Sequence, residues 1–593
     1  MGGDQLAWQI ADQFMEWDNY RTGWVNEKQE VRDYVFATDT SRTNNAENGW
    51  KNSTHIPKLC QIRDNLYANY IAAIFPHDRA IKWEGDDQAA ETKEKRAAIE
   101  AYINNKMRMG DFVPEVEKCI YDFIDYGNCF GMVEFVNETT KDPFTGEEIQ
   151  GYTGPKFRRI SPLDIVFNPV ASSFAETPKV IRNVMTLGNL KKEISSNPEK
   201  EYFEGVFDRI MEVRRQFAGA SQSDYAKGED FKMAGFSSYL DYLQSQYVEV
   251  LDFYGDIYDE DTGEFLENQI VTVIDRSYVL RKVANPSWLG ADTIQHVGWR
   301  HRQDNLYAMG PLDNLLGMQY RIDHLENAKA DGMDLIIHPV IKVRGFVEDF
   351  DYAPNERVFV GDDGDIEFMR PDITLLNADT QIAIYEQKME EMAGAPKQAM
   401  GFRTPGEKTA FEVQMLENGA NKVFLNKTSY FERVFLEPIL NSMLETGRRL
   451  MGPSELISQV DEDFNVKNFR TITKEDITAK GKLRPVGARH FARNANIMQN
   501  LVQLSNTPLM QDQGVRAHIS GKGIAKLMEE LLDLEKFDLV RDNVAIEEDL
   551  ETQQLASEAQ QMLMAQRPPA EDLINNENQM APAPQDARRA GGV

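Results

Sequence analysis

The stretch that decides the fold is GPLDNLLGMQYRIDHLENAKADGMDLIIHP, residues 310–339. Its second residue, Pro311, suits the first turn of a helix, where the missing N–H would be unpaired in any case. Apolar residues then recur at alternating spacings of three and four, at Leu315, Met318, Ile322 and Leu325. This spacing predicts a helix over residues 311–334 with a narrow apolar seam, weakened near its end by Asp331-Gly332.

Beyond this helix the residue types change from helical to β-like. The run 336–343 is rich in β-branched residues, a second strand-like run covers 357–360, and an acidic Gly/Asp turn occupies 361–365. The sequence therefore predicts a small β-containing insert over residues 335–376. Three basic residues on this insert are candidates for binding a partner: Lys342, Arg344 and Arg357.

A second helix with a thin seam leaves the insert. Asn377 or Asp379 can cap it, and its apolar residues predict a helix over 377–393. Neither seam is wide enough to stabilise its helix alone, so we expect both helices to pack against neighbouring subunits. The expected subunit-packing residues are Leu315, Met318, Ile322, Leu325, Ile382, Tyr385 and Met389.

A Gly- and Pro-rich loop follows over residues 394–408, and three cations make it locally basic: Lys397, Arg403 and Lys408. A long helical pattern then runs from Phe411 to Leu450, softened at Gly419 and Pro438. Strand-like fragments at 469–472 and 482–486 and further helical patterns follow. The last residues, 566–593, carry four prolines and few large apolar residues, which predicts disorder.

The region before residue 310 is mixed. Helical patterns cover 64–75, 91–107 and 113–126, and a strand-like run covers 130–135. Two Asp/Thr/Gly-containing segments, 141–151 and 258–265, predict hairpin turns. The second superficially resembles a calcium loop, but it lacks that loop's later acidic positions, so a turn is the favoured interpretation. The fold class is therefore α+β.

Charge and cysteine content limit the functional classes. The chain has 593 residues and a formal net charge of −31, which opposes tight wrapping of nucleic acid. Its three cysteines are too few for a disulfide framework, so a reducing compartment fits best. No apolar run approaches the length of a membrane span, and the first residues lack a signal-peptide pattern.

Sequence motifs for catalysis or metal binding are weak. Residues 401–409, GFRTPGEKT, are similar to a P-loop but have one residue too many before the lysine, and Pro405 removes a phosphate-binding N–H. No histidine stands at a zinc-binding spacing, and His324 is better explained by packing or exposure. We therefore expect a structural chain with no enzymatic activity, cofactor or metal.

The order of elements resembles the portal proteins of tailed bacteriophages. The local likeness lies in Gly310–Leu315 leading through Gln319 and Asn327 to Pro339, and in Ala393-Gly394-Ala395-Pro396 leading to residues 409–413. The resemblance implies a mainly helical portal fold with a wing, two stem helices, a clip, a long kinked helix and a crown. On this likeness, the parts are an N-terminal arm (1–60), a wing (61–310), stem helices (311–334 and 377–393), a clip (335–376), a tunnel loop (394–408), a long helix with a return to the wing (409–510), a crown (511–565) and a disordered tail (566–593).

The same resemblance implies partners and a location. The chain would form a homo-oligomeric ring, a dodecamer in this family, at one capsid vertex of the virion, assembled in the host cytoplasm. The clip would contact terminase and later the neck, adaptor and tail proteins, while other faces meet the major capsid and scaffolding proteins. Terminase supplies the ATPase in this family, so the lack of a complete P-loop motif at residues 401–409 is consistent with the resemblance.

Double-stranded DNA would pass through the channel without sequence specificity. An acidic chain with a few basic loop residues suits sliding, because each neutralised phosphate adds affinity that must be broken at every step. Lys397, Arg403 and Lys408 are the candidates for contact with DNA, although a solvated loop with incidental charge is the alternative. Two other functions stay open: a different virion structural protein, or a metal-dependent nucleic-acid enzyme.

Overall fold

The computed structural model divides the chain into two compact units, Met1–His490 and Phe491–Val593. Of the second unit it describes one helix, α17 (Gly521–Leu531). The described residues are 4–43, 51–75, 81–86, 92–141, 148–197, 200–217, 246–260, 262–287, 293–348, 357–369, 378–393, 423–461, 466–487 and 521–531. They mix helices with several sheets, so the α+β class is confirmed.

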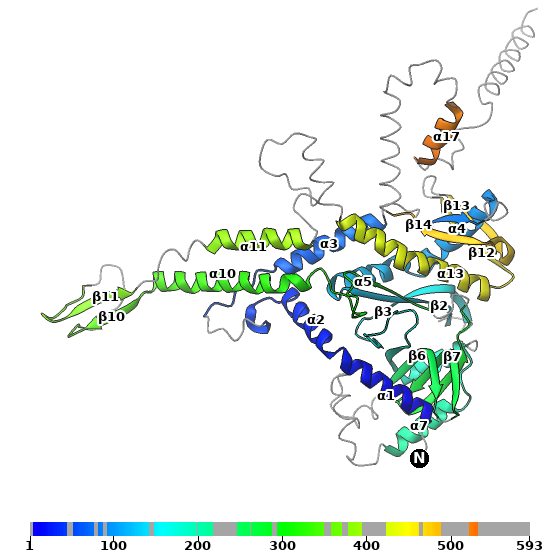
Figure 1. Cartoon of the computed structure of the whole chain (residues 1–593), viewed down its shortest axis with the longest axis horizontal. Coiled ribbons are helices and arrows are strands. Elements are labelled where there is room, and N and C mark those ends of the chain that lie inside the picture. Colours follow the sequence, from blue (N-terminus) through cyan, green and yellow to red (C-terminus); the bar gives the residue numbers. More distant parts are fainter. Residues whose placement is uncertain are drawn as a thin grey trace, which may run out of the picture. The chain divides into compact units, whose positions relative to one another are not determined.

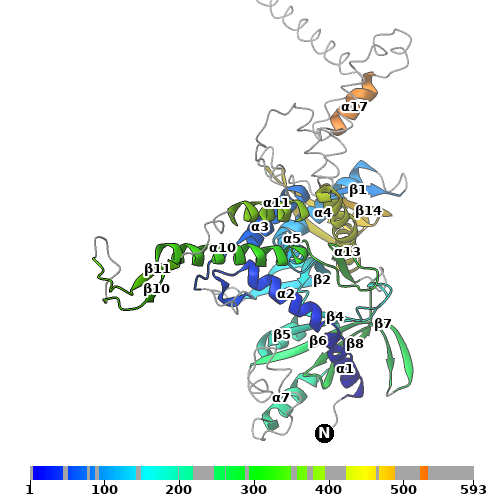
Figure 2. The ribbon, with the colours of Figure 1, turned by 60° about the vertical axis from the view of Figure 1, so that its left-hand side comes forward.

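A five-stranded antiparallel sheet of order β4-β5-β6-β7-β8 forms one layer of the first unit. Successive residues on β6 face opposite sides: Leu251 packs with helix α1, and Val250 packs with residues of α6 and α7. Figure 2 shows α1 beside this sheet. The bounds are β4 Ile165–Phe167, β5 Lys179–Thr186, β6 Tyr247–Asp259, β7 Glu264–Ile274, β8 Tyr278–Ala284, α1 Gln5–Tyr20, α6 Leu187–Ser196 and α7 Val206–Phe217.

The N-terminal residues predicted as an arm therefore contain structural helices. Six side chains of α1 are buried, among them Ile10 and Phe14. A second helix, α2 (Thr22–Val35), continues toward the other core of the unit, where Val31 and Tyr34 are buried.

The largest core lies where helices pack on a three-stranded antiparallel sheet, β3-β2-β9. Rings of Phe123 and Phe431 meet edge to face at 5.1 Å. Gly131 on β2 leaves room for two other rings, because an added Cβ would lie 2.5 Å from the ring of Phe157 and 3.2 Å from that of Phe435. The elements are α3 Lys58–Ile74, α4 Lys93–Met109, α5 Phe112–Asp125, β2 Asn128–Lys141, β3 Glu148–Ile160, β9 Ile294–Gly298 and α13 Glu437–Leu450.

Residues from distant parts of the chain close this core. Strand β1 (Ile81–Gly85) pairs with β14 (Gly481–Pro485), and the side chain of Trp83 on β1 is fully buried. A second pair joins β12 (Ser454–Asp461) to β13 (Val466–Thr473), after which the short helix α14 (Lys474–Ile477) begins. The predicted strand-like fragments at 469–472 and 482–486 are thus confirmed as parts of β13 and β14.

The predicted long helix over 411–450 is described from residue 423 and is not uniform. Residues 423–431 are α-helical, Glu432–Leu436 form a π-helical turn, and α13 follows with Pro438 in its first turn. A proline has no N–H and its ring crowds the carbonyl four residues earlier, so a local change in hydrogen-bond spacing relieves the clash. The predicted softening at Pro438 therefore takes the form of a π turn.

The insert at 335–376 differs in detail from the prediction. Helix α10 (Leu316–Ile337) follows a 3₁₀ turn at Asp313–Leu315 and runs through Asp331-Gly332 without a break. Ile336 and Ile337 are helical, and strand β10 (Val340–Arg344) starts after Pro339. The predicted strand at 357–360 is wrong, because its one ladder contact is an isolated bridge of Val360 to Val347.

Strand β10 pairs instead with β11 (Asp365–Met369), which begins inside the predicted acidic turn. The two hairpins predicted before residue 310 are confirmed, since β2 pairs with β3 and β6 with β7. The predicted tunnel-loop residues Lys397, Arg403 and Lys408 lie outside the described residues, as does the segment 566–593 that was predicted to be disordered.

Candidate functional site

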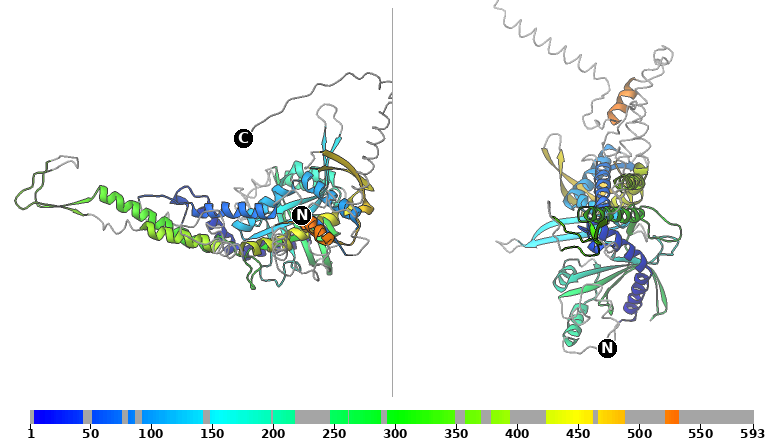
Figure 3. Two further views of the ribbon diagram at one scale, coloured as in Figure 1. Left: turned by 90° about the horizontal axis from the view of Figure 1, so that it is seen from above. Right: turned by 90° about the vertical axis from the view of Figure 1, so that its left-hand side faces the viewer.

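The candidate site is built by α10, the hairpin β10–β11 and α11 (Ala378–Ala393). The two helices lie side by side, and the hairpin extends beyond them (Figures 1 and 3). Lys329 in the second half of α10 bonds to Asp379 at the start of α11 at 2.8 Å. The start of α3 contacts both Gln319, near the start of α10, and Glu390, near the end of α11, so the two helices run in opposite directions. One helix therefore enters the hairpin and the other leaves it.

The seven residues predicted to pack against neighbouring subunits lie instead in the chain's own core. Four are buried, and three are partly buried against the same cluster. The apolar seam that was predicted to be too narrow to stabilise its helix is covered by α2 and α3 of the same chain. The spacing of apolar residues within one helix contains no information on such a neighbour. The buried residues are Leu315, Ile322, Ile382 and Met389, and the partly buried ones are Met318, Leu325 and Tyr385.

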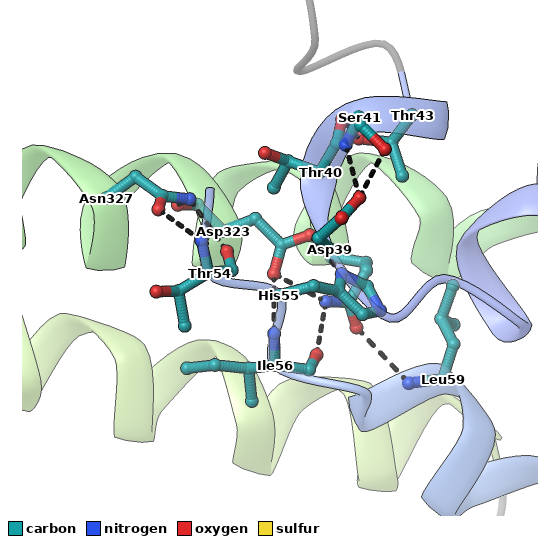
Figure 4. A network of polar contacts seen from close by, with 11 residues as sticks. Asp39, Thr40, Ser41, Thr43, Thr54, His55, Ile56, Leu59, Asp323 and Asn327 are labelled. Atoms are coloured by element: carbon teal, nitrogen blue, oxygen red, sulfur yellow. Dashed lines mark hydrogen bonds and ion pairs between the residues drawn. The ribbon is translucent and has the colours of Figure 1, made fainter. Parts of the chain in front are cut away.

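A row of polar side chains on α10 holds a segment that we call the N-terminal strap, residues 51–57. The row consists of Gln319, Asp323 and Asn327, all buried and each four residues from the next, and it continues to the half-buried Asp331. Residues four apart lie on one face of a helix, so together they form a line of hydrogen-bonding groups. Figure 4 shows two of them, Asp323 and Asn327, beside the strap residues Thr54 and Ile56.

Each of the three buried side chains bonds to the backbone that passes over it. Asn327 accepts from the N–H of Thr54 at 2.8 Å and donates to its carbonyl at 2.8 Å. Asp323 accepts from the N–H of Ile56 at 3.1 Å, and Gln319 donates to the carbonyl of Ile56 at 2.6 Å. The strap is thereby paired as in a sheet, with amide and carboxylate side chains in place of a second strand.

Two further contacts tie the strap to both helices. The imidazole Nδ1 of His55 lies 2.8 Å from a carboxylate oxygen of Asp323, and both side chains are buried. Lys58, at the start of α3, makes a buried ion pair with Glu390 of α11 at 2.6 Å. The strap and the start of α3 therefore fix α10 and α11 at their base.

Gln319 also completes α3. The residue before α3 is Pro57, which supplies no side-chain cap, and the N–H of Leu59 bonds to the amide oxygen of Gln319 at 3.2 Å. The cap thus comes from another helix about 260 residues away in sequence. The sequence analysis missed this row, although its signal, polar residues at a strict spacing of four beside an apolar seam, is visible at 319–331.

The distal end of the site exposes apolar side chains. Phe346 and Phe359 are 79% and 69% exposed, and Ile337 at the end of α10 is 61% exposed. Such exposure is unusual for large apolar residues that lie together. The other exposed apolar residues of the hairpin are Val340, Val343, Val360, Phe368 and Met369.

These residues occur on both faces of the hairpin. Val340 pairs with Met369, and the next pair, Ile341 with Phe368, points to the opposite side. An isolated two-stranded hairpin is marginally stable in water, and none of the described hydrophobic clusters includes this one. The hairpin therefore needs cover that the described part of one chain does not supply.

The predicted partner-binding cations lie on or beside this hairpin. Lys342 is exposed and bonds to Glu367 across the two strands at 2.7 Å, which raises the pKa of Lys342 and lowers that of Glu367. Arg344 and Arg357 are exposed as well. All three are accessible to a partner, and Lys342 has part of its charge balanced within the hairpin.

Arg/Asp pairs line a separate cavity of about 430 Å³ between α2, α3, α5 and the end of β3. Arg63 holds Asp125 with two bonds of 2.7 and 2.8 Å, and Arg159 holds Asp122 with bonds of 2.5 and 2.6 Å. Burial raises the pKa of Asp122 to about 7 despite Arg159. The geometry is that of structural ion pairs, because no nucleophile and base are paired among the lining residues.

Nowhere in the described residues do three or more metal-binding side chains lie close enough together to hold an ion. The ring of His324 lies nearly parallel to that of Tyr320, with centroids 6.4 Å apart, and burial with nearby Arg321 lowers its pKa. Within the described ranges no helix is both long and apolar enough to cross a bilayer.

No family model and no curated protein matches the chain in sequence. The function is therefore inferred from the geometry and from the residues themselves.

Proposed function

We propose that this chain is a portal-type subunit of a tailed phage, a non-enzymatic ring component through which DNA passes at one capsid vertex. One observation carries the proposal. The antiparallel helices α10 and α11, fixed at their base by the strap, present a two-stranded hairpin whose apolar side chains are exposed on both faces. Such a hairpin is expected to be covered by other subunits or by a docked protein.

The order of the other elements supports the same proposal. A mixed α/β part precedes α10, and a helix interrupted by a π turn follows α11 after a Gly- and Pro-rich segment. This order is the one that the resemblance implies for the wing, stem, clip and long helix. In this proposal α10 and α11 are the stem helices, and β10–β11 is the core of the clip.

The proposed partners follow from this assignment. The chain would assemble with copies of itself into a ring, and the clip would bind terminase during packaging and neck, adaptor and tail proteins afterwards. Major capsid and scaffolding proteins would contact other faces. Lys342, Arg344 and Arg357 are proposed to contribute to clip binding, and Lys397, Arg403 and Lys408 to line the channel.

Particle size tests the proposal directly. Negative-stain electron microscopy and mass photometry of the purified chain are expected to show closed rings of uniform subunit number. A monomer at all concentrations and salt conditions would contradict the proposal, and open filaments would favour a different virion protein. Incubation with labelled DNA and Mg²⁺ or Mn²⁺ tests the enzyme alternative, since cleavage would refute a purely structural role.

A further inference from the structure

Three cations and a histidine gather around two aromatic residues in a part of the first unit that the sequence analysis did not single out. Arg300 and His301 come from the segment after β9, and Lys427 and Arg433 come from the helical stretch after residue 423. We call them the Trp299 cation cluster, after the indole on which the group is centred.

The aromatic rings hold the cations in place. The Nζ atom of Lys427 lies 4.7 Å from the centroid of the Trp299 ring and donates a hydrogen bond to the carbonyl of Trp299. The guanidinium carbon of Arg300 lies 5.1 Å from the centroid of the same ring. Two cations on one indole repel each other, and contact with the ring face offsets part of that cost.

Tyr430 organises the second half of the cluster. Its hydroxyl lies 3.0 Å from Nε2 of His301, and the guanidinium carbon of Arg433 lies 5.9 Å from its ring centroid. Arg300, His301 and Arg433 are exposed, while Lys427 is half-buried. The cluster therefore presents several N–H donors to solvent from preorganised positions.

Acidic groups are missing from this cluster in the described part of the chain. Burial and then the positive charge of Arg300 lower the pKa of Lys427, and burial and then Lys427 lower the pKa of His301. No described carboxylate forms an ion pair with Arg300, Lys427 or Arg433. In a chain of net charge −31, cations that repel one another without an acidic partner are typical of an anion-binding surface.

We propose that the Trp299 cation cluster binds phosphate groups of the DNA backbone. The choice of duplex DNA as the polyanion rests on the proposed function. Trp299 is buried, so its ring supports the cations and is not free to stack on a base. Contact through phosphates alone carries no sequence information, which suits DNA that slides past the site.

The position of the cluster in the chain supports this ligand. Lys427 and Arg433 lie on the helix that follows the segment predicted to be the basic tunnel loop. The cluster thus adds cations, in the described part of the chain, to the channel charge that the sequence analysis assigned to Lys397, Arg403 and Lys408. A few cations per subunit give weak individual contacts that a ring would multiply.

The test uses the double variant Arg300→Gln/Arg433→Gln of the full chain. Both side chains are exposed, so the change removes charge and little packing. Binding of a fluorescein-labelled duplex is measured by anisotropy from about 50 to 200 mM salt. Since each phosphate contact contributes a slope of about 0.9 in log K against log salt, the variant is expected to bind at least tenfold more weakly at about 0.1 M salt and with a slope shallower by roughly 2 per site.

Two matched variants control for charge and fold. Arg300→Lys/Arg433→Lys keeps the charge and is expected to keep most of the affinity, while Lys482→Gln/Arg484→Gln removes two cations from β14 and is expected to change little. The proposal is overturned if the Gln variant of the cluster retains wild-type affinity and slope, if the β14 variant loses as much, or if the wild-type chain binds no duplex at low salt. Micrographs of the same samples report ring formation separately, so DNA binding without rings would refute the portal proposal and leave this one standing.

Discussion

Asp323 is the residue on which the attachment of the strap depends most. Its carboxylate accepts from the N–H of Ile56, from Gln319 at 3.0 Å and from the His55 ring, all in a buried setting. Replacing it with Ala would leave several buried donors without a partner. We expect Asp323→Ala to lower the free energy of unfolding by about 3 kcal/mol, measured by urea denaturation.

The matched control is Asp331→Ala, on the same face two turns further along α10. Asp331 also accepts from the strap backbone, from Lys51 at 3.1 Å and Asn52 at 3.0 Å, but it is only half-buried and water can replace it. Its loss is expected to cost under about 1 kcal/mol. Hydrogen exchange gives a second measurement: the amide of Ile56 should exchange faster in Asp323→Ala alone. Equal effects of the two substitutions would contradict the importance of the buried row.

The buried imidazole of His296 is expected to make the stability of the fold depend on pH. Burial lowers its pKa to about 3, with smaller contributions from His301 and Lys179. Its ring stacks on Phe130 at 4.5 Å, and Nε2 lies 3.0 Å from the amide oxygen of Asn128, so the neutral ring donates this bond. The folded pKa lies below the unfolded value, so the unfolded chain binds the extra proton between pH 6.5 and 3, and stability falls as pH falls through this window.

The variant His296→Gln keeps a donor to Asn128 and removes the titrating group. The wild type is expected to lose up to about 1.4 kcal/mol per pH unit below pH 6.5 from this residue, in addition to losses that both proteins share. Unfolding curves at several pH values, expressed as the difference between the two proteins, measure the effect. A difference that stays constant from pH 7 to pH 4 would show that His296 is not held neutral.

At the residue scale the sequence predicted which side chains are buried better than it predicted which elements cover them. All seven seam residues, one in the 3₁₀ turn before α10 and six on α10 and α11, are at least partly buried, but in the core of their own chain. Periodicity within a helix shows which face is apolar and contains no information on what covers it. The row Gln319, Asp323 and Asn327 was missed for a related reason, since polar residues four apart ordinarily indicate a solvated face.

At the scale of elements, the hairpin β10–β11 gives the most direct test of assembly. Phe346 and Phe359 are the most exposed of its aromatic residues. Because they contact little within the chain, Phe346→Ser/Phe359→Ser is expected to leave the unfolding midpoint unchanged within experimental error. The same variant should weaken ring formation or the docking of terminase or neck proteins, as measured by mass photometry and co-sedimentation.

Substitution of a buried seam residue of α10 is the comparison for the variant of the exposed hairpin. Ile322→Asp places a charge in the core beside α3 and should unfold the base of the helix pair, with loss of several kcal/mol. Loss of assembly in that variant would therefore reflect unfolding. Deleting 342–367 removes most of both hairpin strands and leaves α10 and α11 intact, so it is expected to spare folding while abolishing docking. Unchanged docking and assembly in the Ser variant would refute the role of the exposed aromatic residues.

The boundaries of the helices and strands show where local sequence patterns are sufficient to predict the structure. The hairpins β2–β3 and β6–β7 were predicted correctly, because turn chemistry and β-branched runs coincide there. Helix α10 was predicted to weaken at Asp331-Gly332, yet it continues to Ile337. Asp331 and Asp334 bind the strap at Asn52, so a tertiary contact outweighs the low helix propensity of Gly. The sequence of one helix cannot report such a contact.

At the scale of the whole molecule, charge distribution is the property that connects the chain to DNA. An acidic chain of net charge −31 repels a polyanion over most of its surface, so any approach of DNA must be confined to local basic groups. The Trp299 cation cluster is one such group in the described part of the chain. The predicted loop cations are another, and they lie about 20 to 30 residues before Lys427 in the sequence.

The last prediction concerns Lys397, Arg403 and Lys408 together. The surrounding Gly and Pro residues favour a loop, and exposed loop cations contribute little to folding, so changing all three to Ala is expected to leave rings intact. Each contact with phosphate is weak and screened by salt, so single substitutions should have small effects and the triple change a larger one. If the loop cations contact DNA, particles assembled with the triple variant should contain less DNA or retain it poorly, measured by nuclease-protected DNA per particle. Combining the triple change with Arg300→Gln/Arg433→Gln then distinguishes two arrangements. If the loop and the cluster contact DNA independently along one path, the losses of packaged DNA in the two variants should multiply. If the loop acts by shape alone, the combined variant should lose no more DNA than the cluster variant does.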